Sequence, residues 1–487
     1  MNYPNKLFPL ISLFALLSCG GGSDSPEPTP TPPTPTVTAP NVVTTIPANN
    51  ATDIAVGAVN VRITYDKDII KSSDASLQPT VSGGSLSGTT SVSGKNLAFS
   101  VNCTDYDTKV TITIPKGLIG VSGALADAYT LSFTTAKQPE SPSSNISVSP
   151  VVASTDAAKM LYTYFREQYG QKVISSVMAD VNWNNKNAEK VNTLTGKYPA
   201  MNCYDFIHIY VPNQGSNGWI DYTDITPVKQ WADAGGIVQL MWHFNVPLSE
   251  TTEVKTNGDG VTCSPDKTTF KAKNVFTEGS WENKWFYQEM DKVVNVILKL
   301  QDAGIAATWR PFHEAAGNAT AKQQADWTKA WFWWGYDGAE TCKKLWVTMF
   351  DYFKQKGVRN LIWIWTTQNY NGNSTQYNHD MDWYPGDNYV DMVARDLYGY
   401  NAAKNNQEFT EIQARYPNKM VVLGECGKGD SGEQGKISDC WNTGAKWGHF
   451  MVWYQGGQGS TDTMCNDAWW KDAMSNSNVI TRDQIKY

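Results

Sequence analysis

The chain has 487 residues, a formal net charge of -7 and a pI near 5.4. This length exceeds one ordinary domain, so two folded domains are expected. The chain contains no long run of Lys or Arg that could form a basic patch for a polyanion. This argues against nucleic acid as a partner. Aromatic residues make up 12% of the chain, with 20 Trp and 23 Tyr. Large barrels and sandwiches bury many aromatic residues, but this content also predicts that some rings face a ligand.

The N-terminus has the features of an export signal that ends in a lipid-attachment site. Lys6 precedes the apolar run LFPLISLFALLS, and Cys19 follows it. About a dozen apolar residues are too few to cross a bilayer, which takes about 20. The ending ALLSC resembles a bacterial lipobox, in which the Cys becomes the acylated first residue; the alternative is an incidental cysteine at the end of a cleaved signal. We therefore predict a signal peptide over 1–18 and a lipid on Cys19 that anchors the protein to the bacterial outer membrane, on the cell surface or, alternatively, on its periplasmic face.

A spacer and a small β-domain come next. Residues 19–38 are rich in Pro and Thr, with little apolar surface to bury, and should form a disordered tether. Residues 39–136 show short alternating runs such as VNVRITYDKDI and KVTITIPKG, separated by turn residues, which predict an all-β sandwich. The sequence at both ends of this region resembles bacterial Ig-like domains. We interpret it as a stalk, with a carbohydrate-binding module as the alternative, followed by a linker over 137–147.

Residues 148–487 alternate apolar, strand-like runs with longer amphipathic stretches. The amphipathic stretches end at Gly, as helices often do. The strand-like runs begin with KVISSVMAD, YPAMNCYDF, IVQLMWHFN and IAATWRPFHE, and continue with NLIWIWT, VDMVARDLYG, MVVLGECG and HFMVWYQ. Eight such runs predict an α/β fold, a (β/α)8 TIM barrel. A doubly wound open sheet is the alternative, but no GxGxxG or GxxxxGK[ST] loop follows any run.

Polar and aromatic residues collect at the carboxyl ends of these runs, where a barrel of this type builds its active site. Glu314 ends the fourth run and Glu425 lies at the end of the seventh. Cleavage of a glycosidic bond with retention needs two carboxyl groups, one that protonates the leaving oxygen and one that attacks the anomeric carbon. We predict that the two carboxyl groups lie about 5 to 5.5 Å apart, because about 6.5 Å or more would indicate inversion.

Four motifs together resemble glycoside hydrolase family 26. They are WRPFHE from Trp309 to Glu314, WFWWG from Trp331 to Gly335, RDLY from Arg395 to Tyr398, and GECG from Gly424 to Gly427. The resemblance covers roughly residues 150 to 487. It implies a barrel of retaining glycosidases in which Glu314 is the acid/base and Glu425 the nucleophile.

The resemblance also implies roles for the residues around the carboxylate pair. His243 and His313 would contact the bound sugar, and Trp331 and Trp453 would pack against its rings, with core filling as the alternative for the two Trp residues. Tyr398 would hydrogen-bond the nucleophile and hold it ionised. Asp396, Arg310 and Asp205 would support the site, with a structural ion pair as the alternative for the last two. The stretch AAGNATAKQQADWTKA separates Glu314 from Trp331, a longer spacing than in simpler family members, which puts the geometry of Trp331 in question.

The spacing of the histidines argues against a metal-dependent enzyme. His313 and Glu314 begin like the zincin motif HExxH, but the position of the second His is Gly317. No cofactor and no metal site is therefore predicted.

The sequence thus predicts a retaining endo-β-1,4-mannanase that hydrolyses mannan, galactomannan or glucomannan. The same mechanism on mixed-linkage β-glucan or β-1,3-xylan is the alternative, and a non-catalytic glycan-binding surface protein is a distant one. The expected partners are a β-mannan, the membrane through Cys19 and other glycan-uptake proteins on the same surface.

Overall fold

The computed structural model describes residues 37–136, 145–180, 183–216, 219–317, 330–367, 382–455 and 462–486. The chain divides into two compact units, Met1–Pro139 and Glu140–Tyr487. Cys19, the predicted signal peptide and nearly all of the predicted tether lie outside the described residues. Within the described ranges, no helix is both long enough and apolar enough to cross a membrane.

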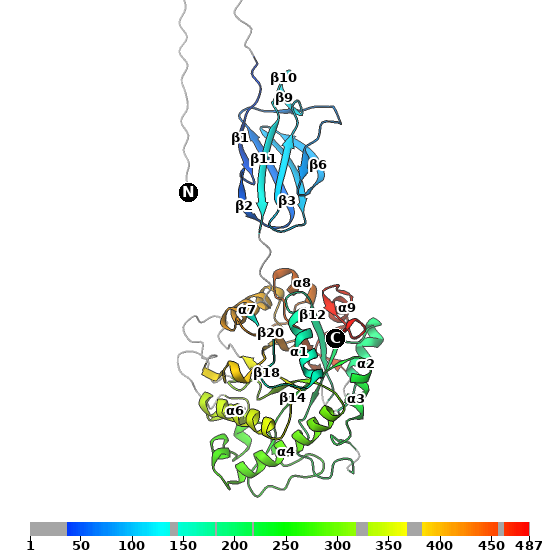
Figure 1. Ribbon diagram of the computed structural model, residues 1–487, viewed down its shortest axis with the longest axis vertical. Coiled ribbons are helices and arrows are strands. Elements are labelled where there is room, and N and C mark those ends of the chain that lie inside the picture. The colour runs from blue at the N-terminus through cyan, green and yellow to red at the C-terminus, as the bar shows by residue number, and fades with distance from the viewer. Residues whose placement is uncertain are drawn as a thin grey trace, which may run out of the picture. The chain divides into compact units, whose positions relative to one another are not determined.

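The first unit is a β-sandwich, as predicted (Figure 1). Its two four-stranded sheets have the orders β1-β3-β7-β6 and β2-β11-β8-β5, and a small third sheet has the order β10-β9-β4. The strand bounds are β1 Val42–Ile46, β2 Ala51–Ile54, β3 Gly57–Tyr65, β4 Ile70–Lys71, β5 Thr80–Ser82, β6 Ser85–Ser93, β7 Asn96–Cys103, β8 Lys109–Ile114, β9 Ile119–Val121, β10 Ala124–Leu125 and β11 Tyr129–Thr135. Every second residue of β3 from Val59 onward is buried, so the alternating pattern of the sequence places one face of each sheet in the core.

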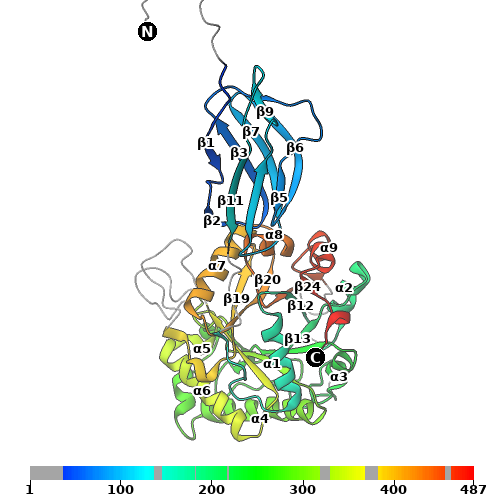
Figure 2. The ribbon, with the colours of Figure 1, turned by 45° about the horizontal axis from the view of Figure 1, so that its top comes forward.

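The second unit is built on a closed barrel of eight parallel strands, and the prediction of an α/β barrel is confirmed (Figures 1 and 2). The strands follow the order β13-β14-β17-β18-β19-β20-β21-β12, and pairing of β12 with β13 closes the barrel. Their bounds are β12 Val173–Met178, β13 Met201–Asp205, β14 Ile237–Trp242, β17 Ala307–Pro311, β18 Leu361–Thr367, β19 Met392–Tyr398, β20 Met420–Gly427 and β21 His449–Val452. Each predicted run coincides with one of these strands, although β18 extends one residue beyond its run, to Thr367. Almost every residue in them is buried, as expected for parallel strands covered on both faces.

Helices and short strands surround the barrel. The helix bounds are α1 Asp156–Gln168, α2 Lys186–Thr195, α3 Thr226–Asp233, α4 Trp281–Asp302, α5 Trp333–Tyr336, α6 Ala339–Gln355, α7 Ala402–Arg415, α8 Ile437–Thr443 and α9 Asp467–Ser475. Several begin at a residue whose side chain accepts a backbone N–H, as Thr155 does for α1 and Ser280 for α4. The remaining strands are β15 Val246–Pro247, β16 Val261–Thr262, β22 Tyr454–Gln455, β23 Asp462–Thr463 and β24 Val479–Ile480, of which β24 pairs with β12.

A sulfur-rich layer fills part of the barrel. It consists of Met178, Cys203, Met241 and Met451, all fully buried. The partly buried Trp453 packs against this layer from the carboxyl end of the strands. Flexible thioethers adapt to irregular space, so this layer gives the residues above it a packed base. The seven cysteines of the described residues are all free thiols.

Candidate active site

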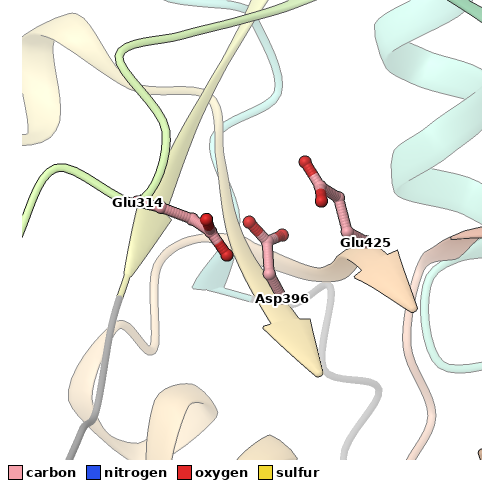
Figure 3. A group of neighbouring side chains, drawn as sticks. All are labelled: Glu314, Asp396 and Glu425. Carbon is pink, nitrogen blue, oxygen red and sulfur yellow. The ribbon is translucent and has the colours of Figure 1, made fainter. Parts of the chain in front are cut away.

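Three carboxyl groups meet at the carboxyl ends of the barrel strands (Figure 3). Glu425 is on β20, Asp396 is on β19, and Glu314 lies three residues after the end of β17. One oxygen from each group lies within 4.8 Å of the other two. Figure 3 shows Asp396 between the two glutamates, with all three side chains directed toward one another. The barrel therefore brings together the two glutamates that the sequence predicted as a pair.

A β-bulge at Gly424 directs Glu425 into the site. In the pairing of β19 with β20, Arg395 faces Leu423 but Asp396 faces Glu425, so Gly424 is the extra residue. A bulge of this kind changes the face to which the next side chain points. A Cβ atom on Gly424 would lie 2.6 Å from Oδ1 of Asp396 and 2.9 Å from Cβ of Ala394. Only glycine fits there without displacing Asp396.

Two donors hold the carboxylate of Glu425, one on each oxygen. The phenol of Tyr398 donates to Oε2 at 2.5 Å, and Nη2 of Arg310 donates to Oε1. Nη1 of the same guanidinium donates to Asp396 Oδ2 at 3.0 Å and to Thr366 Oγ1 at 3.2 Å. Arg310 is fully buried. A buried guanidinium shared by two carboxylates fixes both in position and stabilises their negative charge.

The third carboxyl group, Glu314, has a strongly perturbed pKa. Burial, followed by the charges of Asp396 and Glu425, raises the pKa of Glu314 well above its ordinary value. Burial also raises the pKa of Asp396, to about 7, against the opposing effect of Arg310. A carboxyl group with a raised pKa, beside one whose two oxygens each accept a hydrogen bond, has the character of a general acid beside a nucleophile.

A chain of two histidines and an aspartate borders the carboxylates. Asp205 at the end of β13 accepts from the backbone N–H of His243 at 2.9 Å and contacts its Nδ1 at 2.5 Å. Nε2 of His243 lies 3.0 Å from Nε2 of His313. Burial lowers the pKa of His243, but the Asp205 carboxylate outweighs it and raises that pKa. Burial and the nearby charges of His243 and Arg310 hold the pKa of His313 well below the usual range.

The two histidines differ in their access to a ligand. The side chain of His313 is buried and its Nε2 faces His243, whereas His243 is the more exposed of the two. The predicted direct contact between His313 and the sugar stays a prediction.

Of the two predicted stacking residues, Trp453 lies beside His243, and Trp331 is the chain neighbour of a ring that contacts both histidines. Trp453 follows β21, and its ring centroid lies 5.7 Å from that of His243. Trp331 is 40% exposed. Its neighbour Phe332 has ring centroids 5.7 Å from His243 and 5.3 Å from His313. The WFWWG block therefore lies against the site despite the long stretch before it, of which residues 318–329 lie outside the described residues.

The carboxyl cluster also has the spacing of a metal site. Within the described ranges, one group of acidic side chains has oxygens close enough together to hold an ion, namely Glu314, Asp396 and Glu425. Two of these carboxylates are already paired with Arg310, so the protein supplies its own cation there. This donor set fits proton transfer and nucleophilic attack better than metal binding.

Sequence reasoning missed three features of this site. It placed Asp396 in a supporting position, whereas its carboxyl group lies directly between the two glutamates. It did not find Thr366, a third partner of Arg310 beside Asp396 and Glu425, because a single Thr in a buried strand carries no recognisable signal. It also did not find the left-handed backbone of Glu314, whose φ is 49°.

Comparisons with known proteins agree with this geometry. The model of glycosyl hydrolase family 26 matches residues 151–484, and that of a bacterial Ig-like domain matches residues 36–135. A solved structure, the GH26 domain of an endo-β-mannanase/endo-β-glucanase from Prevotella bryantii, is 57% identical with a TM-score of 0.66 and covers 69% of this chain and 99% of that one. A β-mannanase from a symbiotic protist of the termite Reticulitermes speratus, complexed with gluco-manno-oligosaccharide, is 31% identical with a TM-score of 0.55, covering 70% of this chain and 98% of that one.

Curated relatives are more distant. A mannan endo-1,4-beta-mannosidase from Thermothelomyces thermophilus is 28% identical over 345 residues, which cover 68% of this chain and 62% of that protein. Two Piromyces mannan endo-1,4-beta-mannosidases, A and B, match over 49% and 52% of their lengths, so the chain spans about half to three fifths of these relatives. The family model nevertheless covers well over half of this chain. On that match, and with the carboxylate pair held at the ends of β17 and β20, the chain belongs to glycosyl hydrolase family 26.

Proposed function

We propose that this protein is a retaining endo-β-1,4-mannanase. The observation that carries the proposal is the placement of Glu314 and Glu425, with carboxyl oxygens within 4.8 Å of each other. That spacing fits attack by one carboxylate on a sugar bound to both. It is closer to the about 5 to 5.5 Å between the carboxyl groups of retaining enzymes than to the about 6.5 to 9.5 Å of inverting enzymes, and so supports retention.

In the first step, the carboxylate of Glu425 attacks the anomeric carbon. The bond from that carbon to the glycosidic oxygen breaks, and Glu314 gives its proton to the departing oxygen. The product is a glycosyl ester on Glu425. Tyr398 and Arg310 orient the attacking carboxylate, since each donates to one of its oxygens.

In the second step, Glu314 acts as a base. It takes a proton from water, the water oxygen bonds to the anomeric carbon, and the ester bond to Glu425 breaks. The first step favours this change of role, because esterification removes the charge of Glu425, one of the causes of the raised pKa of Glu314. The pKa of Glu314 should therefore fall in the glycosyl-enzyme and rise again when the ester is released.

Mannan as the substrate rests on the relatives. The 57% identical GH26 domain comes from an endo-β-mannanase/endo-β-glucanase, and the 31% identical enzyme is a β-mannanase complexed with gluco-manno-oligosaccharide. The curated matches are mannan endo-1,4-beta-mannosidases. These names support linear mannan, galactomannan and glucomannan as the substrates to be tested first.

The test compares initial rates of the purified protein on these three polymers with rates on mixed-linkage β-glucan and β-1,3-xylan. We expect the mannans to be cleaved fastest, with a mixture of oligosaccharides among the early products, as internal cleavage requires. Glu425→Ala should abolish the activity, and Glu278→Ala, a substitution of an exposed glutamate, serves as the matched control. Faster cleavage of either other polymer, or full activity in Glu425→Ala, would refute the assignment.

We also propose that the protein is anchored to the bacterial outer membrane through a lipid on Cys19. The lipobox-like ALLSC sequence and the Pro/Thr-rich segment after it support this. Labelled fatty acid should be incorporated into the full-length protein in cells and not into Cys19→Ala. Equal labelling of the two proteins would contradict the proposal.

A further inference from the structure

The backbone that carries Glu314 has an unusual conformation. Phe312 and Glu314 have φ angles of 48° and 49°, in the left-handed region that residues with a Cβ atom rarely adopt. The backbone N–H of Gly317 donates to the carbonyl of Glu314 at 3.1 Å, which closes a tight turn. Two such residues separated by one position persist only where surrounding contacts impose the conformation.

Trp334 supplies one of those contacts. Its indole Nε1–H donates to the carbonyl oxygen of His313, the residue before Glu314, at 2.9 Å. Its side chain is fully buried, and its ring stacks on Phe332 with a centroid distance of 4.4 Å. This hydrogen bond holds the peptide group between His313 and Glu314 in one orientation.

Gly335 supplies the second contact. A Cβ atom at this position would lie 1.6 Å from the carbonyl oxygen of Ala315 and 2.7 Å from its carbonyl carbon. The obstacle is backbone, so no rotamer change can relieve it. The absence of a side chain at Gly335 is therefore what allows the residue after Glu314 to take its place.

The turn that carries both residues also has a hydrogen bond to a residue outside the Glu314 loop. The backbone N–H of Trp333 donates to the carbonyl of Cys263 at 2.9 Å, and that of Gly338 donates to Gly335 at 3.1 Å. The turn thus contacts the peptide group before Glu314 and the carbonyl of Ala315, the residue after it.

We propose that Trp334 and Gly335 are positioning residues that impose the left-handed backbone of Glu314 and so aim its carboxyl group at the glycosidic oxygen. The inference rests on the proposed function, in which Glu314 is the acid/base. It gives Trp334 and Gly335, the last Trp and the Gly of WFWWG, a role other than stacking on a sugar ring.

Trp334→Phe tests the hydrogen bond, and Trp333→Phe is its matched control. Both residues are buried and both lose an indole N–H, but Nε1 of Trp333 donates to the carbonyl of Phe244 and not to the Glu314 loop. Gly335→Ala tests the close packing. Thermal unfolding and near-ultraviolet circular dichroism of each variant show whether it folds, and if Gly335→Ala does not fold, Trp334→Phe decides.

The readout is the dependence of kcat/KM on the leaving group. Mannan releases a sugar alcohol that needs a proton, whereas 2,4-dinitrophenyl β-mannobioside releases a phenolate that does not. We expect Trp334→Phe and Gly335→Ala to lose about 10-fold or more on mannan and little on the activated substrate, since a positioned general acid contributes about 100-fold or more. Trp333→Phe should show no such difference. The proposal is overturned if Trp334→Phe loses equally on both substrates or loses nothing. It is also overturned if Trp333→Phe shows the same dependence on the leaving group.

Glu314→Ala separates this inference from the function on which it depends. Its kcat/KM should fall strongly on mannan and weakly on the activated substrate. If Glu314→Ala lacks this pattern, the assignment of Glu314 as acid/base is wrong. If Glu314→Ala shows the pattern and Trp334→Phe does not, only the positioning role is wrong.

Discussion

Asp396→Asn should move the alkaline limb of the pH profile of kcat/KM toward lower pH. The carboxyl group of Asp396 lies within 4.8 Å of that of Glu314, and its charge is the second cause of the raised Glu314 pKa, after burial. Asparagine has nearly the same shape and no charge. Removing a neighbouring negative charge lowers the pKa of a carboxylic acid, so the general acid should lose its proton, and the enzyme its activity, at lower pH.

The size of the shift follows from the distance. A full charge at 4.8 Å contributes about 3.5 kcal/mol at an effective dielectric constant of about 20. Asp396 contributes only part of this, because burial raises its own pKa to about 7 and leaves it partly protonated near neutral pH. Arg310 offsets part of this, because it donates to Asp396 as well. We expect a shift of about 1 unit, while burial still holds the pKa of Glu314 above its ordinary value.

The assay is kcat/KM for a soluble manno-oligosaccharide across the pH range in which the folded protein is stable. Thr366→Val is the matched control, because it removes another hydrogen bond of Arg310 without removing a charge. Its alkaline limb should stay in place. An alkaline limb of Asp396→Asn that is unchanged, or that moves to higher pH, would refute the electrostatic account.

Three further outcomes are expected. Tyr398→Phe removes the donor at 2.5 Å from Glu425 and should lower kcat/KM on mannan by about 10- to 100-fold. This corresponds to a charge-assisted hydrogen bond of about 1.5 to 3 kcal/mol. A change below about 2-fold would contradict the role of Tyr398. Asp205→Asn removes the carboxylate that raises the pKa of His243. An NMR titration of the histidines should therefore show that His243 loses its proton at a lower pH than in the parent protein. An unchanged titration would contradict this. Asp391→Ala leaves one buried and one partly buried backbone N–H group without an acceptor and should cost about 2 to 5 kcal/mol in urea unfolding. A loss under about 1 kcal/mol would contradict its structural role.

The barrel could be predicted from sequence because its strands are buried on both faces. Runs such as VVLGEC and LIWIWT are nearly continuous apolar segments, and in a parallel barrel the carboxyl end of each run lies on the same side. That single rule placed Glu314 and Glu425 on a common face although 110 positions separate 314 from 425. The Ig-like unit could be predicted for the complementary reason, since its strands alternate between buried and exposed residues.

What could not be predicted depends on contacts between backbone atoms. The register shift at Gly424 and the φ angle of Glu314 follow from how β19 meets β20 and how Gly335 meets Ala315. No periodic pattern of residue types encodes such contacts. The sequence indicates only that glycines stand in GECG and WFWWG, and the structure supplies the reason for two of them.

The most direct test of the account is the anomeric form of the first product. Hydrolysis of a manno-oligosaccharide, followed by proton NMR before mutarotation, reports which face of the anomeric carbon the water attacked. A double displacement through Glu425 predicts that the β-anomer appears first and the α-anomer grows in later. Initial release of the α-anomer would show inversion and contradict the assignment of Glu425 as a nucleophile.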